Sequence, residues 1–319
     1  MANNNVRRRV YGLTIRQWIT IVVIVGAVVV FGCRSCYNFV RERVSPTNEN
    51  ANVTQPENSN RGKKRQPGTT KPASSLSIQE ATERYLRLGN PSNAAQSDAN
   101  NFLMVNSEYA LSYNRLRGTA NWVAWTVTQA DFGAADRAND FRQDDRLPKG
   151  FYRVATNDYT GSGYDRGHLC PSADRTGSPE ANSATFLMTN ISPQTGDLNR
   201  NVWGNLENYS RELVRQGNEL YIIAGMYGEK GKIKGKVTIP TNFWKIIIVL
   251  PNGVDDAANT TADARVIAAD MPNVNGIKAD DWRKYRTTVR NIEQKTGLNL
   301  LSNLPPNVQN TLKTKMDNQ

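Results

Sequence analysis

The sequence contains one histidine, His168, which ends the run Tyr-Asp-Arg-Gly-His at positions 164–168. Histidine is the side chain whose unperturbed pKa allows it to accept and release a proton near neutral pH. Any acid–base chemistry that uses an imidazole must therefore use His168. Because a lone histidine is more often a packed or surface residue than a catalyst, this prediction depends on the residues around it.

The residues just before His168 suit a phosphate site. Gly161 and Gly163 let the backbone approach a ligand closely. Asp165 and Arg166 are compatible with orienting the imidazole and binding phosphate. Each feature alone is weak evidence for a phosphate site, but together and in this order they are strong evidence.

Four residues downstream are spaced by four positions: Asn199, Trp203, Glu207 and Arg211. On a helix each such step rotates by only about 40°, so the four side chains form one stripe on a single face. An asparagine oxygen can ligate a hard cation, a glutamate can hold its water shell, and an arginine can pair with phosphate. The alternative is a solvent-facing ion pair between the last two residues, with the tryptophan in the core. Taken alone, this helix favours that alternative.

A cysteine near the histidine opens a competing interpretation. Cys170 follows His168 by two residues, so a Cys–His hydrolase has to be considered. Buried free cysteine is common, and Cys170 is therefore interpreted as a packing residue. The remaining cysteines, Cys33 and Cys36, lie near the N-terminus, so we expect neither a disulfide framework nor a zinc site in the folded part.

The positive charge is concentrated near the N-terminus. The 319-residue chain has a formal net charge of +11. Residues 1–76 contain 12 basic and 3 acidic residues, a net of +9, whereas residues 77–319 contain 28 and 26, a net of +2. A nucleic-acid site in the folded part must therefore be a local basic cleft.

The N-terminal region has the pattern of an exported or anchored protein. Residues 18–32 are uncharged and apolar, and four arginines precede them. An uncleaved anchor, a cleaved signal and lipidation at Cys33 remain open, with the anchor favoured. In each case we expect the following domain to lie outside the cytoplasmic membrane. The predicted organisation is a basic segment with an anchor or signal at 1–44, a disordered polar tether at 45–76, and one domain at 77–319.

The element pattern of 77–319 predicts an α+β fold with a mainly antiparallel sheet flanked by helices. Ser77 and Glu80 form a capping box for a helix that ends near Gly89. Expected strands lie at 102–105, 109–113, 121–128, 151–155, 185–188, 220–227, 236–239, 244–250 and 266–269. Expected helices lie at about 200–216, 282–295 and 307–315.

Three segments together resemble a known family. They are Tyr-Asp-Arg-Gly-His at 164–168, Asn-Ile-Ser-Pro-Gln at 190–194, and Asn-x-x-x-Trp-x-x-Leu-Glu-x-x-x-Arg at 199–211. They resemble the DNA/RNA non-specific endonucleases, which are sugar-non-specific nucleases with a ββα-metal active site. The similarity runs from about Phe102 to the C-terminus and is greatest to the cyanobacterial members.

The resemblance implies a role for each matching residue. His168 would be the general base, and Asn199 the only direct protein ligand of Mg²⁺, with Mn²⁺ as an alternative. Glu207 would hold the metal's waters, and Arg137 would stabilise the charged transition state. Because that last alignment crosses a variable stretch, Arg142 and Arg146 are alternatives to Arg137. Arg166 would be a further catalytic residue that supports phosphate contact, and Asp165 and Arg211 would bind substrate.

The implied activity is Mg²⁺-dependent hydrolysis of DNA and RNA with little sequence or sugar specificity, leaving 5′-phosphate ends. The alternative is a membrane-tethered receptor that binds nucleic acid without catalysis, using the cleft and the basic cluster at 61–65. A Cys170 hydrolase is the third hypothesis. Expected partners are DNA and RNA, the membrane through the apolar segment, and a protein inhibitor as a candidate. The sequence does not set the oligomeric state.

Overall fold

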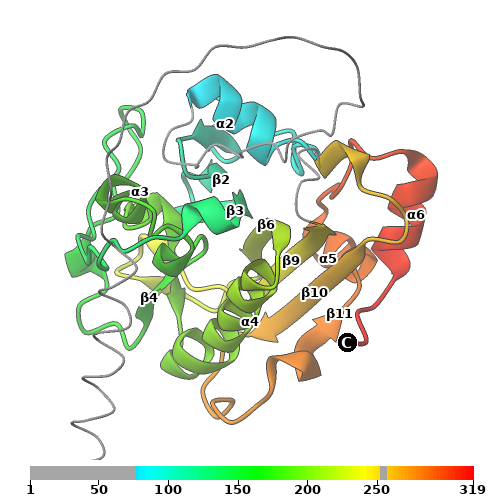
Figure 1. Ribbon diagram of the computed structural model, residues 1–319. Coiled ribbons are helices and arrows are strands. Elements are labelled where there is room, and N and C mark those ends of the chain that lie inside the picture. The colour runs from blue at the N-terminus through cyan, green and yellow to red at the C-terminus, as the bar shows by residue number, and fades with distance from the viewer. Residues whose placement is uncertain (1–76, 252–256) are drawn as a thin grey trace, which may run out of the picture. The chain divides into compact units, whose positions relative to one another are not determined.

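The computed structural model describes residues 77–251 and 257–319 (Figure 1). The predicted anchor or signal at 1–44 and tether at 45–76 lie outside these residues. Over the two described ranges, no helix combines the length and apolarity needed to cross a bilayer.

A seven-stranded antiparallel sheet forms the centre of the domain (Figure 1). This confirms the predicted α+β fold with a mainly antiparallel sheet. Its spatial order is β1-β2-β3-β6-β9-β10-β11. The strands are β1 (Phe102–Val105), β2 (Ala110–Asn114), β3 (Thr119–Val127), β6 (Asn218–Tyr227), β9 (Asn242–Pro251), β10 (Arg265–Pro272) and β11 (Arg286–Thr287).

Helices bury both faces of this sheet. The central strands β6 and β9 are therefore apolar on both sides, with Ile222 and Ile247 facing one core and Ile223 and Ile246 facing the other. The first core receives α2 (Ile78–Tyr85) and α4 (Gly204–Arg215). The second receives α5 (Val289–Thr296) and α6 (Pro306–Thr314).

A small hairpin outside the sheet carries the histidine. Strand β4 (Asp165–His168) pairs antiparallel with β5 (Ile191–Gln194), with His168 opposite Ile191. A π-helical turn (Leu198–Trp203) and then α4 follow β5. The element order is thus β-β-α, the arrangement implied by the resemblance. Two further small elements are α3 (Pro179–Ala184) and a second hairpin of β7 (Lys232–Ile233) and β8 (Val237–Thr238).

Two predicted strands are wrong. Residues 151–155 form a loop, whose conformation is fixed by side-chain bonds such as Tyr152 Oη to Asp158 Oδ1 at 2.8 Å. Residues 185–188 join α3 to a short helical turn, and only Leu187 makes an isolated bridge, to Arg142. The residues of these runs that pack on the core clusters are Phe151, Val154 and Met188, and burial alone does not create a strand.

The helix predictions are partly correct. The capping box is present, because Glu80 N donates to Ser77 Oγ and Ser77 N donates to Glu80 Oε2. The expected helix at 282–295 is wrong as a single element: it divides into a 3₁₀ turn (Trp282–Tyr285), β11 and α5. Pairing of β11 with β10 interrupts it, and Thr288 caps the new helix by accepting from Asn291 N.

Candidate active site

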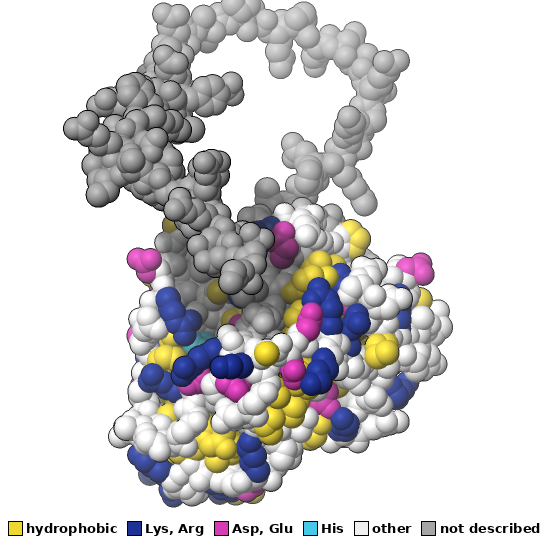
Figure 2. Space-filling model, turned by 90° about the horizontal axis from the view of Figure 1, so that it is seen from below, with side chains coloured by type: hydrophobic (Ala, Val, Ile, Leu, Met, Phe, Trp, Pro, Cys, Tyr) yellow, Lys and Arg dark blue, Asp and Glu magenta, His cyan; other side chains and the backbone are white. Residues whose placement is uncertain are grey.

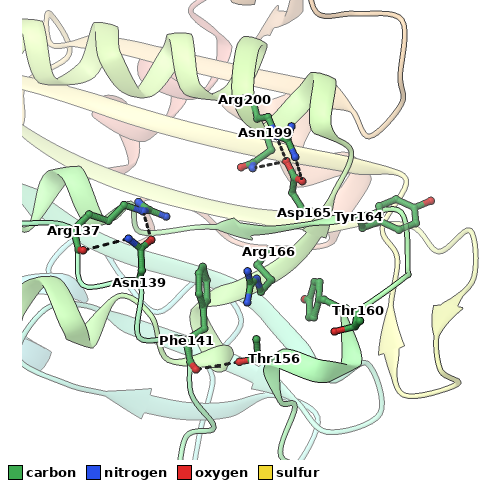
Figure 3. Close-up of a pocket in the computed structure, with 11 residues that line it drawn as sticks. Arg137, Asn139, Phe141, Thr156, Thr160, Tyr164, Asp165, Arg166, Asn199 and Arg200 are labelled. Atoms are coloured by element: carbon green, nitrogen blue, oxygen red, sulfur yellow. Dashed lines mark hydrogen bonds and ion pairs between the residues drawn. The ribbon is translucent and has the colours of Figure 1, made fainter.

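A polar cavity of about 430 Å³ opens beside β4 and the π-helical turn (Figure 3). It brings together four segments that are far apart in sequence: the 137–141 loop, the 156–160 turn, the start of β4, and the π-helical turn. Its lining residues are Arg137, Asn139, Phe141, Thr156, Tyr159, Thr160, Tyr164, Asp165, Arg166, Asn199 and Arg200. Four predicted site residues, Arg137, Asp165, Arg166 and Asn199, thus face one space.

Asp165 connects β4 to the π-helical turn. Its carboxylate accepts from Asn199 Nδ2 at 3.0 Å and from Arg200 Nε and Nη2 at 2.8 and 2.6 Å. Burial raises the pKa of Asp165, but these donors outweigh it and hold the pKa below its usual value. An ionised carboxylate only accepts hydrogen bonds, so the amide nitrogen of Asn199 must face it. The carbonyl oxygen of Asn199 is thereby directed away from Asp165, as Figure 3 shows.

The turn that carries Asn199 departs from the predicted α-helix. Residues 198–203 are π-helical, and the α-helix begins only at Gly204. Asn199 N donates to Thr195 O at 2.9 Å, so the turn is anchored directly behind β5. Such wide turns are rare and occur frequently at functional sites.

His168 is packed between two aromatic rings and is only 8% exposed. Its ring centroid lies 5.4 Å from that of Phe141 and 4.9 Å from that of Phe186, edge to face with the latter. Its Nε2 is buried without a hydrogen-bond partner in the described part of the chain. Burial, together with the charges of Arg137 and Arg166, lowers the pKa of His168 to about 3. The imidazole is therefore neutral at physiological pH.

The same two aromatic rings hold the two arginines. The guanidinium carbon of Arg137 lies 4.9 Å from the Phe186 centroid, and that of Arg166 lies 4.2 Å from the Phe141 centroid. Arg137 also donates to Ser172 Oγ and to Asn139 Oδ1. An aromatic face attracts a cation without cancelling its charge. Both arginines thus line the cavity as positive groups, and Figure 2 shows dark blue side chains around the small cyan area of the histidine.

Gly167 is required by packing inside the motif. A Cβ atom at this position would lie 2.1 Å from Gln194 Oε1 on the partner strand. The side chain of Gln194 therefore lies directly against the backbone between Arg166 and His168. This contact keeps the β4–β5 pair close at the point where the histidine is presented.

Glu207 and Arg211 lie behind the cavity and do not line it. Glu207 Oε1 lies 3.5 Å from Nζ of Lys245, a 1% exposed residue of β9. Burial raises the pKa of Glu207 and lowers that of Lys245, and their mutual attraction opposes both shifts. The guanidinium of Arg211 is bound to Asp174 at 2.9 Å and to Asn208. Their predicted roles toward metal waters and substrate stay predictions.

The three arginines considered for charge stabilisation are now distinguished by position. Arg142 pairs with Asp140, and Arg146 pairs with Asp144. Of the three, Arg137 is the one that lines the cavity. Cys170 is fully buried, and burial raises the pKa of its thiol, which agrees with a packing role and disfavours a thiolate nucleophile.

Several residues around the site were not predicted from the sequence. Lys245 could have been found, because it is a charged residue inside the apolar run Phe-Trp-Lys-Ile-Ile-Ile of β9. Phe141 and Phe186 carry no signal as ring partners of the histidine, since they lie far from it in sequence. Arg200 is likewise linked to Asp165 only by the fold.

A cation at this site would be held mainly by water. Among residues 77–251 and 257–319, no group of three or more His, Cys, Asp or Glu side chains is arranged to hold a metal. The Asn199 carbonyl oxygen, fixed by Asp165 on its nitrogen side, is a suitable single ligand for a hydrated hard cation. The residues present therefore fit the cation that the motif implies.

Comparison with known proteins agrees with these observations. Residues 89–307 match the family model for DNA/RNA non-specific endonucleases. A nuclease of Nostoc sp. (strain PCC 7120 / SAG 25.82 / UTEX 2576) is 52% identical over 237 residues, covering 73% of this chain and 86% of that nuclease. A nuclease of Serratia marcescens is 32% identical over 228 residues, covering 68% and 81%.

A solved structure shares the fold. It is a crystal structure of the EndoG/EndoGI complex, with a TM-score of 0.59 and 24% identity, covering 72% of this chain and 94% of that one. The family inferred from the motif is confirmed, as is the similarity to the cyanobacterial nuclease. This chain is a member of the DNA/RNA non-specific endonuclease family, and thus a non-specific endonuclease.

Proposed function

We propose that this endonuclease hydrolyses DNA and RNA phosphodiesters with a divalent cation, using His168 as general base and leaving 5′-phosphate ends. The observation that carries this proposal is the cavity that joins Arg137, Arg166, Asp165 and Asn199 beside the buried imidazole. Because the family consists of nucleases, the non-catalytic receptor is not retained as a hypothesis.

His168 would supply the base through a nitrogen of its imidazole ring. Its Nε2 is enclosed without a hydrogen-bond partner in the described part of the chain. The neutral ring is favoured because Phe141 and Phe186 exclude solvent and two guanidinium groups oppose a further positive charge. Because the ring is already neutral at neutral pH, it does not have to lose a proton before the reaction.

Arg137 and Arg166 stabilise the charge that grows on the phosphorus oxygens. Their positive charges are held in place by Phe186 and Phe141, so they need little rearrangement when the transition state forms. Each guanidinium also presents planar N–H donors that match phosphate oxygens.

The cation would be held by Asn199, with Glu207 completing its surroundings from behind the cavity. When bound, it supplies Lewis-acid neutralisation of the phosphate and assistance to the leaving 3′-oxygen. Asp165 orients the Asn199 amide for this purpose. We infer Mg²⁺ as the natural cation and Mn²⁺ as a substitute, since both prefer oxygen ligands.

Tolerance of both sugars follows from which groups face the cavity. The charged lining residues are arginines and one carboxylate that is already bound, and these suit contacts to the backbone that DNA and RNA share. We also infer an exported location from the apolar run at 18–32 and its preceding arginines. Cell fractionation and the N-terminal mass of the mature chain test that inference.

The central experiment uses the purified full-length chain with plasmid DNA and RNA, at neutral pH, with Mg²⁺ or EDTA. We expect both substrates to be degraded with Mg²⁺ and preserved with EDTA. Phosphatase-sensitive 5′ ends would support the proposed bond cleavage. His168→Ala is expected to lower kcat by on the order of 10²–10⁴. Full activity of this variant would rule out the proposed base, and activity in EDTA would rule out the cation.

A further inference from the structure

A second polar cavity adjoins the first, on the side away from the π-helical turn. Its volume is about 390 Å³, and the β7–β8 hairpin forms one of its walls through Lys232, Ile233 and Lys234. Thr160 lines both cavities, so the two hollows meet at this residue. A chain leaving the first cavity past Thr160 would therefore reach the hairpin.

The hairpin is strongly basic on its outer surface. Residues 229–236 read Glu-Lys-Gly-Lys-Ile-Lys-Gly-Lys, and Lys230, Lys232, Lys234 and Lys236 are all exposed. Ile233 between them is buried, in a small core that also contains Ile191 of β5. Because strand residues alternate between faces, burying this isoleucine directs its two lysine neighbours outward.

Two of these lysines are fixed by aromatic rings, and two are held only at carbonyl oxygens. Lys230 Nζ lies 5.6 Å from the ring centroid of Tyr164, which lines the first cavity, and Lys236 Nζ lies 5.4 Å from that of Tyr152. Lys232 Nζ donates to Leu116 O at 3.3 Å, and Lys234 Nζ donates to Asn157 O at 2.6 Å. Neutral carbonyls leave the charge of both ammonium groups uncompensated.

The acidic side chains of this region bind groups other than Lys232 and Lys234. Asp158, which lines the second cavity, is buried and accepts from Tyr152 Oη and from the backbone of Ala155. Burial lowers the pKa of Arg117, and the charge of Glu229 partly opposes that shift, so Glu229 interacts with an arginine outside the hairpin. No ion pair involves Lys232 or Lys234 within the part of the chain that the structure describes.

The turn of the hairpin contains a lysine where the backbone favours another residue. Lys234 and Gly235 have φ values of 45° and 68°, both in the left-handed region, and Lys236 N donates to Ile233 O at 2.9 Å. Asparagine or glycine adopts such a conformation more readily than lysine. The strained lysine is consistent with a role for its charge.

We propose that the β7–β8 hairpin is a second nucleic-acid subsite, in which Lys232 and Lys234 bind backbone phosphates distant from the cleaved bond. This inference rests on the proposed function, because the two cavities would hold successive parts of one substrate. The subsite contributes affinity for long substrates and places no group near the reacting phosphorus. It recognises phosphate alone, so it serves DNA and RNA alike.

The test is the double variant Lys232→Gln/Lys234→Asn in the full-length chain. We expect kcat/KM on a 30-base-pair duplex to fall roughly tenfold at 0.1 M salt, and the loss on a dinucleotide to be at least fivefold smaller. The slope of log kcat/KM against log salt should decrease in magnitude by about 1.8, from about 0.9 per lost phosphate contact. The melting temperature should be unchanged or higher, since asparagine relieves the strained turn.

A matched control removes two lysines that line neither cavity. Lys284→Gln/Lys315→Gln changes the net charge equally, near β11 and the C-terminus, and should leave the salt slope unaltered. Equal slopes for both double variants would overturn the subsite. So would an equal loss on the dinucleotide and the duplex, because that result indicates a general structural effect.

Binding measurements separate this inference from the proposed function. Fluorescence anisotropy of the labelled duplex in EDTA, on a His168→Ala background, reports hairpin binding without cleavage. If the wild-type chain cuts nothing, the proposed function fails, but a weaker affinity of the lysine variant would still support the subsite. If the wild-type chain cuts and the lysine variant binds with unchanged affinity, the subsite alone fails.

Discussion

The buried Arg175 differs from the two cavity arginines, Arg137 and Arg166, in the groups that surround its charge. Carboxylates neutralise the charge of Arg175, whereas aromatic rings hold the cavity arginines. Arg175 is 1% exposed and pairs with Glu108 at 3.1 Å and with Asp131 at 3.8 Å. It also donates to the backbone carbonyls of Glu108 and Thr126. Its charge is thus neutralised entirely within the protein, and it joins the segment before β2, strand β3 and the 129–131 turn.

The cavity arginines are held by aromatic faces, which leave their charge available. Burial lowers the pKa of Arg175, but its acidic partners more than offset this and raise it overall. Burial lowers the pKa of Arg137, and the attraction of Glu207 only partly opposes it. The comparison indicates that a carboxylate partner gives an arginine a structural role, whereas an aromatic partner leaves it ready for an anionic substrate.

Arg175→Met gives the largest expected effect on stability. It leaves Glu108 and Asp131 buried without their cation, so the free energy of unfolding should fall by about 3–5 kcal/mol. Urea unfolding measures this loss. Arg142→Met removes an exposed pair with Asp140 and should cost below about 1 kcal/mol. Similar losses for both variants would contradict the structural role given to Arg175.

Arg137→Met should show the opposite pattern. We expect kcat to fall by on the order of 10²–10³, because preorganised positive charge at the phosphate is lost, with little change in unfolding free energy. Steady-state kinetics on plasmid and RNA measure the effect. Arg142→Met serves again as control: if it lowered kcat as much as Arg137→Met, the charge stabiliser would have to be reassigned.

Asp165→Asn removes the carboxylate that accepts hydrogen bonds from Asn199 and Arg200. An amide there cannot accept from Arg200 as an anion, and the orientation of Asn199 is no longer enforced. Metal affinity should fall roughly 10–100-fold, measured by Mn²⁺ binding in titration calorimetry. Arg200→Ala removes the 72% exposed partner but keeps the contact to Asn199, so its effect should be smaller. An equal effect would mean that the ion pair, and not the amide orientation, matters.

The depressed pKa of His168 predicts a dependence of stability on pH. Its folded-state pKa is about 3 and its unfolded value about 6.5, so the unfolded chain binds this proton more tightly. Stability from the neutral ring is complete above pH 6.5 and is lost as the pH falls toward 3, by at most about 1.4 kcal/mol per unit. His168→Gln should lack this component, so the two unfolding curves should diverge between pH 7 and 4. Parallel curves would contradict the depressed pKa.

The central sheet could be predicted from sequence because its signals are local. Strands β1, β6 and β9 are apolar runs bounded by turn residues, and the predicted ranges overlap them closely. The strands of the histidine hairpin were missed. Strand β4 contains a charged pair and a glycine, and β5 contains a proline, so neither has a strand pattern.

Only those site residues that belong to the sequence motif or follow it at a regular spacing could be predicted. Residue order placed Asp165, Arg166, His168 and Asn199 in one region, and the fold brings three of them to one cavity. The rings of Phe141 and Phe186 and the buried Lys245 depend on tertiary contacts between distant segments. Those contacts set the exposure and charge of the histidine, and no local pattern encodes them.

The π-helical turn at residues 198–203 accommodates one more residue than an α-helix would over the same path. Since each residue of an α-helix advances the chain by about 100°, a single deletion within this turn would rotate Asn199 away from Asp165 while α4 kept its packing. Length variation of one residue at this position would thus change the orientation of the proposed cation ligand independently of the helix that follows.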